Sequence, residues 1–342
     1  MEYYALLYAL CPPLFALGPR PQALILMAIK KIMTHHARQF GTLLGLLILC
    51  VTLWILTPYF LTVSNLLNIV EQTSINAIIA VGMTFVIISA GIDLAVGSIL
   101  ALAGIAMASA LQAQAPIPLA IATGLATGTV CGLTSGFLIT RGKLPPFIAT
   151  LGMMSVARGA ALVYAEGRPV SGFELNFRTI ATGEFLFVPL PAITMIVVYL
   201  FAHLVLTRTK FGRYTYAMGG NEEAARLSGV NVRLHKAMVY GLSGLMSALA
   251  AVILTARLNS AQPIAGIMYE LDAIAATVIG GASLLGGEGT LLGTLIGALI
   301  MGVLRNGLNL LGVSSFLQQI IIGAVIIIAV AVDMGLKSSK RT

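Results

Sequence analysis

Polar side chains inside long apolar segments are the residues of this 342-residue chain with the most chemistry to offer. They are carboxylates and carboxamides, which form hydrogen bonds with a polar solute. A carboxylate at the centre of a membrane span costs about 3 kcal/mol on insertion scales, so such a residue lies at a helix break or has a function. The candidates for lining or gating a pathway are Asn68, Gln72, Asn76, Asp93, Glu270 and Asp272.

The carboxylates have a structural interpretation beside the functional one. Asp93 lies just ahead of an apolar segment that begins at Ala95, where an acidic residue caps the positive end of a helix. The alternative is a gate near the inner mouth of a pathway. Glu270 and Asp272 open a later segment in the same manner.

The amides and two arginines leave similar alternatives. Asn68, Gln72 and Asn76 line the outer entrance of a pathway or form hydrogen bonds between helices. Arg158 and Arg305 lie within apolar segments, so they need partners or a water-filled path.

Signatures of catalysis and of metal binding are missing from the sequence. It contains no GxxxxGK[ST] phosphate loop, no HExxH and no GxSxG, so we expect no ATPase site and no enzyme. The cysteines show no CxxC or His–Cys spacing, and we expect neither metal nor cofactor on this chain. The cysteines and histidines are Cys11, Cys50, Cys131, His35, His36, His203 and His235.

Composition assigns the chain to the membrane. Hydrophobic residues make up 58% and charged residues 9%, and the mean hydropathy is +0.97. A soluble domain is near a quarter charged, so we predict an all-α, polytopic integral membrane protein with about ten transmembrane helices. The predicted spans are Gly41–Thr57, Ser74–Ala90, Ala95–Gln112, Ile117–Thr140, Phe147–Ala165, Val188–Thr207, Ala237–Ala256, Asp272–Gly286, Leu291–Leu310 and Phe316–Val332.

Basic residues predict the orientation, because loops rich in Lys and Arg stay cytoplasmic. Ten spans bring four basic segments to one face, so we expect both termini in the cytoplasm. The net charge of +8 is then an insertion signal and not a sign of nucleic-acid binding. The four groups are Lys30, Lys31 and Arg38; Arg141 and Lys143; Arg208, Lys210, Arg213, Arg226, Arg233 and Lys236; and Lys337, Lys340 and Arg341.

Three parts are expected along the chain. Residues 1–40 form a cytoplasmic or interfacial extension, or an artefact of an upstream start codon, since Tyr3–Leu17 is too short to span a membrane. Residues 41–333 form the transmembrane domain, and 334–342 a basic cytoplasmic tail. Two longer polar segments interrupt the domain: Glu166–Phe187 on the outer side, suited to contact with a soluble partner, and 208–236 on the inner side.

The inner segment contains the signs of a short helix. Asn221–Ser228 is preceded by two glycines and closed by Gly229, which indicates a capped start and a glycine stop. A helix this short is not stable alone, so it docks into a groove of another protein or is a solvated linker.

Three segments together resemble the permease subunit of bacterial ribose-type ABC importers. They are GIDLAVGS at Gly91–Ser98, GGNEEAARLSGVNV at Gly219–Val232, and the glycine-rich stretch Tyr269–Phe316. The resemblance extends over about Leu56–Asp333, and the first 40 residues depart from it.

The resemblance implies an ABC importer permease fold and several partners. These are cytoplasmic ATP-binding subunits that hold ATP and Mg, a second permease subunit, identical or a close paralogue, and a periplasmic sugar-binding protein, at a bacterial inner (plasma) membrane. The solute is ribose or a related monosaccharide. The coupling helix is assigned by resemblance to Gly219, Gly220, Asn221, Glu222, Glu223, Ala224, Ala225, Arg226, Leu227, Ser228 and Gly229.

A physical argument agrees with this assignment of the coupling helix, because closure of the ATPase can move a permease only through a rigid element that contacts both. Glu222, Glu223 and Arg226 are expected to pair with the ATPase, and Ala224, Ala225 and Leu227 to form a small packing face. The rival hypothesis is a stand-alone secondary carrier driven by an ion gradient. A membrane-embedded enzyme is disfavoured because paired catalytic residues are missing.

The sequence also contains regularly spaced glycines and a weak similarity between two of its own segments. Gly289, Gly293 and Gly297 are four apart, which allows close helix packing or a moving interface. A shift of 196 residues aligns Asn76-Ala-Ile with Asp272-Ala-Ile, as in transporters with repeated halves, but the two segments have the same predicted orientation.

Overall fold

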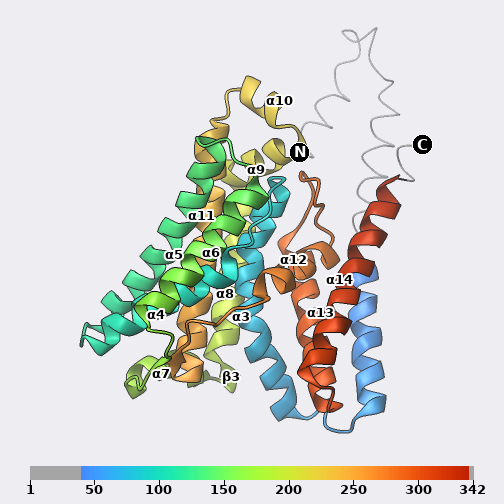
Figure 1. The fold of residues 1–342 in the computed structure, drawn as a ribbon. Coiled ribbons are helices and arrows are strands. Elements are labelled where there is room, and N and C mark those ends of the chain that lie inside the picture. Colours follow the sequence, from blue (N-terminus) through green and yellow to red (C-terminus); the bar gives the residue numbers. More distant parts are fainter. Residues whose placement is uncertain (1–39, 339–342) are drawn as a thin grey trace.

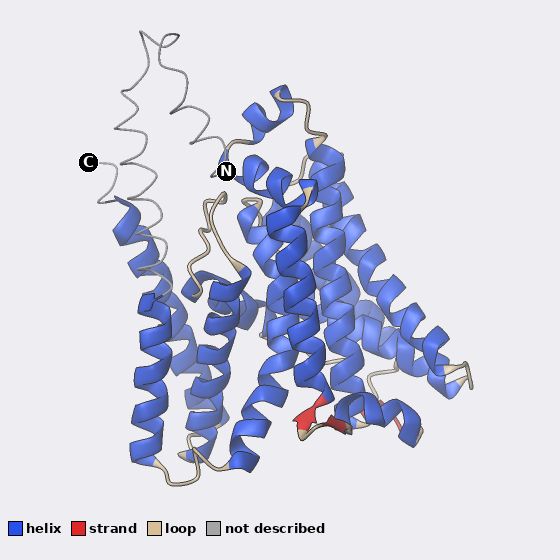
Figure 2. Cartoon of the chain, turned by 180° about the vertical axis from the view of Figure 1, so that it is seen from behind, coloured by secondary structure: helices blue, strands red, loops and turns tan. Residues whose placement is uncertain are grey.

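The computed structural model describes residues 40–338, and the predicted N-terminal extension therefore lies outside the described residues, as do 339–342. The described chain is a bundle of helices (Figures 1 and 2). In order, these are Phe40–Leu56, α3 (Val63–Ile88), α4 (Val96–Gln112), α5 (Ile117–Thr140), α6 (Pro146–Tyr164), α7 (Leu175–Thr182), α8 (Leu190–Arg208), α9 (Lys210–Gly220), α10 (Glu222–Leu227), α11 (Val232–Leu258), α12 (Tyr269–Ile279), α13 (Leu291–Leu310) and α14 (Ser315–Ser338).

Within residues 40–338, four two-residue strands lie in the connections. β1 (Val170–Ser171) pairs antiparallel with β4 (Ser260–Ala261), with Val170 opposite Ala261. β2 (Glu184–Phe185) and β3 (Val188–Pro189) form a hairpin. The strands therefore fasten loops and build no sheet layer.

The prediction of a polytopic helical membrane protein is confirmed, but the number of spans is not. Within residues 40–338, six helices are long and apolar enough to cross a membrane: α3, α5, α6, α8, α11 and α13. Phe40–Leu56, α4 and the apolar part of α14, Ser315–Ile328, are shorter apolar helices.

The eighth predicted span, Asp272–Gly286, is wrong in its extent. Its helix, α12, starts earlier, at Tyr269, and stops at Ile279. Eleven residues at 1.5 Å each rise only about 16 Å, half of the hydrocarbon thickness. The helix ends where glycines adopt left-handed backbone conformations. Gly281, Gly286 and Gly287 have φ angles of 93°, 84° and 74°, which helical residues do not adopt. We call residues 280–290 the glycine loop.

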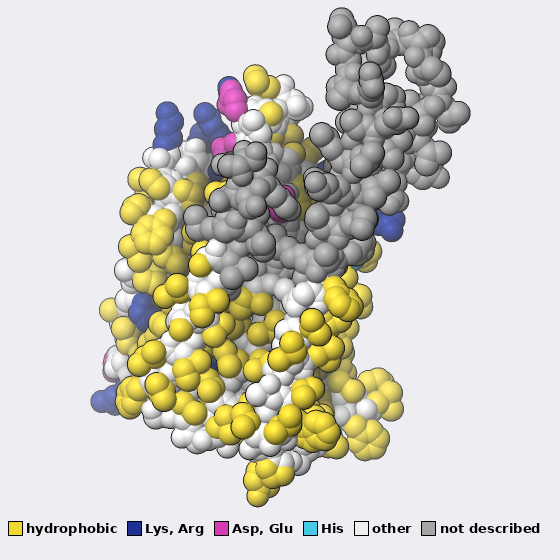
Figure 3. Space-filling view, turned by 90° about the vertical axis from the view of Figure 1, so that its right-hand side faces the viewer, with side chains coloured by type: hydrophobic (Ala, Val, Ile, Leu, Met, Phe, Trp, Pro, Cys, Tyr) yellow, Lys and Arg dark blue, Asp and Glu magenta, His cyan; other side chains and the backbone are white. Residues whose placement is uncertain are grey.

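The two ends of the bundle carry different elements. α9 and α10 lie at one end, while α7 and β3 lie at the other (Figure 1). Apolar side chains cover most of the flank seen in Figure 3, and several charged side chains stand at its upper end. Such a flank suits a lipid solvent, in which apolar exposure carries no penalty.

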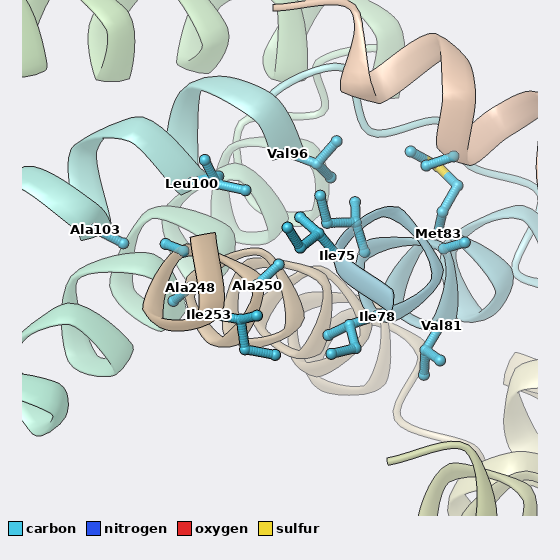
Figure 4. Close-up of a cluster of buried hydrophobic side chains, with 14 of the residues drawn as sticks. Ile75, Ile78, Val81, Met83, Val96, Leu100, Ala103, Ala248, Ala250 and Ile253 are labelled. Carbon is cyan, nitrogen blue, oxygen red and sulfur yellow. The ribbon is translucent and has the colours of Figure 1, made fainter. Parts of the chain in front are cut away.

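α3 is the central helix of the bundle. From Ala77 to Ile88 all its side chains are buried, and Ile78 and Ile79 are fully so. Its side chains Ile75 and Ile78 lie on the side of Val96 of α4 and of Ala250 and Ile253 of α11, as Figure 4 shows, and Val81 and Met83 extend the same buried cluster on the other side of α3.

α5 packs on α11 through a row of glycines spaced four apart. Gly128 faces the backbone of Gly244, Gly132 faces the carbonyl of Tyr240, and Gly136 faces Ala237. A side chain at any of these positions would collide with the backbone of α11. Small residues thus let two membrane helices approach closely, which gains dispersion contacts where the hydrophobic effect is absent.

We expect Gly132→Ala to destabilise the protein by about 1–3 kcal/mol, because the added methyl group pushes α5 off α11. The measurement is the thermal unfolding midpoint in detergent. Gly152→Ala in α6 is the matched control, since nothing lies within 4 Å of a Cβ at that position. Equal midpoints for the two variants would contradict this account of the α5–α11 contact.

Candidate functional site

α10 is a six-residue helix with both ends capped, as the sequence predicts. The side chain of Asn221 accepts a hydrogen bond from the Ala224 amide at 2.9 Å, which satisfies one of the free N–H groups of the first turn. At the other end Gly229 has a φ of 86°, and the Val230 amide donates to the Ala225 carbonyl. This glycine stop turns the chain sharply toward α11.

Two contacts hold α10 on the bundle. Ala225 is buried against Met218 of α9 and Val232 of α11. Lys236 Nζ donates to Glu222 Oε2 at 2.7 Å, and the Lys236 side chain is only 11% exposed. The expectation that Ala225 belongs to an outward packing face is therefore wrong, because this methyl group anchors α10 to its own chain.

The outward side of α10 is formed by other residues. Leu227 is 77% exposed, and Glu223 and Arg226 are exposed as well. Arg226 Nε donates to Glu223 Oε2 at 3.0 Å, and this hydrogen bond lowers the pKa of the Glu223 carboxyl below its ordinary value. The outer face of α10 thus presents one large apolar side chain beside an exposed ion pair.

α9 joins α10 to the bundle and is not among the helices expected from the sequence. Thr209 caps it by accepting from the Gly212 amide. Thr215 Oγ1 and His235 Nε2 of α11 lie 2.9 Å apart, and the Phe211 ring contacts those of Phe85 and His235. The face of α9 that carries Phe211 and Thr215 is therefore fixed against α3 and α11.

The last turn of α9 also contacts the glycine loop. Gly219 lies so close to the Ile88 carbonyl that a Cβ there would collide with it, and the same carbonyl accepts a hydrogen bond from the Gly287 amide at 2.8 Å. Tyr216 Oη donates to the Gly289 carbonyl at 2.6 Å. Burial raises the pKa of Tyr216 to about 12, so the phenol keeps its proton and remains a donor.

A second group of polar residues lies between α3, α12 and α13. Asp272, which is 3% exposed, accepts from Arg305 Nη2 at 2.7 Å and from Asn76 Nδ2 at 3.2 Å, both at Oδ2. A cavity of about 30 Å³ adjoins this ion pair. Its lining, which we call the polar recess, consists of Gln72, Thr73, Asn76, Asp272, Ala276, Ala298, Met301, Gly302 and Arg305.

Hydrogen bonds on both sides of the recess join α3 to α13. Asn65 and Asn306 exchange amide hydrogen bonds of 3.1 and 2.9 Å. Thr84 Oγ1 and Thr294 Oγ1 lie 2.8 Å apart. Polar pairs of this kind hold membrane helices in register, so they fix the α3 and α13 walls of the recess relative to each other.

The pathway candidates divide between the recess and other places. Gln72, Asn76 and Asp272 come together in it, whereas Asn68 is exposed and is not part of its lining. Glu270 lies against Gly97 of α4, since a Cβ at that glycine would be 2.8 Å from Glu270 Oε2. The sequence similarity between residues 76 and 272 corresponds to a direct hydrogen bond between them.

Asp93 is fully buried in the connection ahead of α4. Its Oδ1 accepts from the Ala95 amide at 3.0 Å and its Oδ2 from Ser243 Oγ at 2.8 Å. The N-cap residue of α4 is Ala95, so Asp93 is not the N-cap that the sequence suggests: it accepts from the amide of the N-cap residue, two positions later.

Arg305 and Arg158 both have partners, as membrane-embedded arginines require. Arg305 pairs with Asp272, and Arg158 Nη1 donates to the carbonyls of Pro263 and Ala265 at 2.7 Å each. The sequence indicates that these arginines need partners but does not identify carbonyls of a distant loop. Thr73 and Gly302 of the recess were also missed, because neither residue type is unusual in a membrane helix.

The glycines predicted to allow close packing do so at two of three positions. Gly293 faces the Gly280 carbonyl and Gly297 faces that of Ala276, so α13 packs closely on α12. Gly289 lies outside both helices, in the glycine loop.

Comparisons with known proteins agree on one family. Residues 65–330 match the family model described as branched-chain amino acid transport system / permease component. The ribose import permease protein RbsC of Bacillus subtilis (strain 168) is 53% identical over 298 residues, which cover 86% of this chain and 92% of that protein. RbsC of Escherichia coli (strain K12) is 52% identical over 296 residues, covering 85% and 92%.

A more distant relative is similar over nearly its whole length. The galactose/methyl galactoside import permease protein MglC of Escherichia coli (strain K12) is 38% identical over 334 residues, which cover 91% of this chain and 98% of that protein. No solved structure matches the chain significantly.

We expect Lys236→Met to loosen α10, because it removes the ion pair with Glu222 and leaves mainly the Ala225 contact as an anchor. Hydrogen exchange at the amides of residues 222–229 should become several-fold faster, since a partly exposed ion pair contributes about 1 kcal/mol at most. Arg233→Met, on the exposed side of the same helix, is the matched control. Unchanged exchange in Lys236→Met would contradict the anchoring role.

Proposed function

The chain belongs to the family of branched-chain amino acid transport system permease components, and we propose that it is the membrane subunit of an ATP-driven importer of ribose or a related monosaccharide. The observation that carries the proposal is 53% identity to a ribose import permease over 92% of that protein's length. Relatives named for galactose are less similar, at 38%, which favours a pentose over a hexose.

We propose that α9 and α10 couple transport to ATP hydrolysis. The segment Gly219–Gly229 would seat in a cleft of a cytoplasmic ATP-binding subunit, with Leu227 as its apolar contact and Glu223 and Arg226 as its charged contacts. ATP and Mg would be held by that subunit. The anchors of α10 support this role, because a lever transmits motion only if it is fixed to what it moves.

The expected target of the lever is the interior of the bundle. α9 contacts Ile88 at the end of α3 and Gly287 and Gly289 in the glycine loop. α3 and the two helices joined by that loop, α12 and α13, form the polar recess. A displacement of α9 would therefore shift the walls of the recess relative to one another.

The proposed orientation places α9 and α10 in the cytoplasm, with both termini on the same side, in a bacterial inner membrane. The basic residues between 208 and 236 support this assignment. α7 and the β2–β3 hairpin, at the opposite end of the bundle, would then face the periplasm and receive the sugar-binding protein.

A second permease subunit, a copy of this chain or a close paralogue, would complete the pathway. Arg305 is 39% exposed and Gln72 is exposed, on the side where α3 and α13 meet. A guanidinium group facing lipid is costly, so this face is better explained by a water-filled pathway between two subunits. Gln72, Asn76 and Asp272 are its proposed lining, while Asn68, Asp93 and Glu270 remain candidates by position.

Reconstitution tests the proposal. The chain, its ATP-binding subunit and its sugar-binding protein, placed together in liposomes, should take up D-ribose only when ATP is present, and ribose should stimulate ATP hydrolysis. Ribose uptake by this chain alone, driven by a proton or sodium gradient, would establish the secondary-carrier alternative instead.

We expect Leu227→Asp to weaken association with the ATP-binding subunit at least about tenfold, since it places a charge at the main apolar contact. Co-purification in detergent over a range of protein concentrations measures the affinity of the chain for the ATP-binding subunit. Leu175→Asp on α7 is the control, because it is an exposed leucine at the opposite end. If both variants bound the subunit equally, α10 would not be the docking element.

Tyr216→Phe should reduce ribose uptake per ATP hydrolysed by about fivefold, since it removes one hydrogen bond, worth about 1 kcal/mol, between α9 and the glycine loop. ATP hydrolysis itself should persist. Tyr214→Phe, which lies on α9 and contacts His235 by its ring, is the matched control. Full coupling in Tyr216→Phe would show that the glycine loop is not in the path of the motion.

A further inference from the structure

We propose that the polar recess binds a single hydroxyl group of the passing sugar, with Thr73 as the central contact. This inference rests on the proposed function. It assigns a ligand group to a cavity whose most buried polar residue, Thr73, is not among the pathway candidates.

Two buried oxygens of the recess have no hydrogen-bond partner in the described part of the chain: Thr73 Oγ1 and Asn76 Oδ1. Thr73 is 2% exposed, and it lines the cavity beside Asp272 and Arg305. Buried hydroxyls in helices usually donate to a carbonyl one turn earlier, as Thr277 does to Ala273 at 2.7 Å. An oxygen left unpaired in this way needs an external partner.

The chemistry of the recess matches a neutral hydroxyl. Asp272 uses Oδ2 for both of its donors, and no donor among the described residues reaches Oδ1. The recess therefore has oxygens that accept a hydrogen bond, while Arg305 and the Thr73 hydroxyl donate one. A hydroxyl group both donates and accepts, so it satisfies both kinds. A cation would lie against the guanidinium group, and an anion against the carboxylate.

The size of the cavity limits what enters it. About 30 Å³ holds one water-sized group and excludes a sugar ring. Arg305 and Gln72 stand at its exposed side. The ring therefore stays outside, in the pathway, and inserts one hydroxyl that replaces a water molecule.

Gly302, which also lines the recess, packs directly against the Thr73 side chain. A Cβ at this position would collide with Thr73 Oγ1, so any larger residue would displace the hydroxyl. The close approach of α3 and α13 at Gly302 thus leaves room for the Thr73 hydroxyl in the lining of the cavity.

The first experiment removes the Thr73 hydroxyl without changing its shape. In liposomes that contain the complete importer, Thr73→Val should lower the initial rate of D-ribose uptake about fivefold, the loss expected for one hydrogen bond. Thr73→Ser, which keeps the hydroxyl, should stay within about twofold of the unmodified protein by the same reasoning. Thr277→Val is the matched control, because that hydroxyl is paired within its own helix and does not line the recess.

Thermal stability separates this role from a structural one. Valine removes a buried unpaired oxygen, so the unfolding midpoint of Thr73→Val should be unchanged or higher even as uptake falls. Gly302→Ala offers a second route, since its methyl group would collide with Thr73 Oγ1 and displace the hydroxyl. Gly323→Ala in α14 is the control, because nothing lies within 4 Å of a Cβ at that position. Gly302→Ala should reduce uptake while the Gly323 variant transports normally.

Normal ribose uptake by both Thr73→Val and Gly302→Ala would overturn the proposal and leave the recess as a water site. The proposal would also be overturned if Thr73→Val lost uptake together with a lower unfolding midpoint and Thr73→Ser lost as much uptake. If the unmodified complex itself imported no ribose, the proposed function would fail first, and this inference with it.

Discussion

The carbonyl of Ile88 lies where three segments of the chain meet. Ile88 is the last residue of α3, the central helix of the bundle. Its carbonyl accepts a hydrogen bond from the Gly287 amide and contacts the backbone of Gly219 at the end of α9. Any side chain at residue 219 would open this junction. Because the contact is between backbones, it has no flexible side chain that could absorb a displacement. This close approach therefore helps to fix the end of α9, and through it α10, relative to α3 and to the glycine loop.

Rigid and deformable parts of the bundle can be distinguished by their packing. α5 and α11 lie backbone to backbone from Gly128 to Gly136, about two turns, and α3 is buried in the same core. By contrast, α12 has eleven residues and ends in a loop whose glycines adopt left-handed conformations. Glycine backbones change conformation at little steric cost. Motion transmitted by α9 is thus expected to bend the glycine loop before it disturbs α5 and α11.

The sequence predicts the parts that depend on local pattern and misses those that depend on contacts. Apolar length locates the long helices, although only six of those in residues 40–338 are long and apolar enough to cross a membrane, and Asn221 with Gly229 marks both ends of α10. The extent of α12 was wrong because Asp272–Gly286 has the composition of a span, while the left-handed glycines that end the helix are set by tertiary contacts such as Gly287 with Ile88. The pairing of Asp272 with Arg305, 33 residues away, and the place of Thr73 in the recess follow only from the way α3, α12 and α13 pack.

The pairing of acidic residues bears on the source of energy. A carrier driven by protons or sodium needs a carboxylate that is free to bind the ion at some stage of the cycle. Here Asp272 is bound by Arg305 and Asn76, and Asp93 by Ser243 and the Ala95 amide. Each carboxylate is already stabilised by donors, and binding an ion would require breaking those bonds. The exposed Leu227 and the anchored α10 are instead the proposed docking site of a separate protein, in keeping with the proposal that ATP hydrolysis by a partner supplies the work.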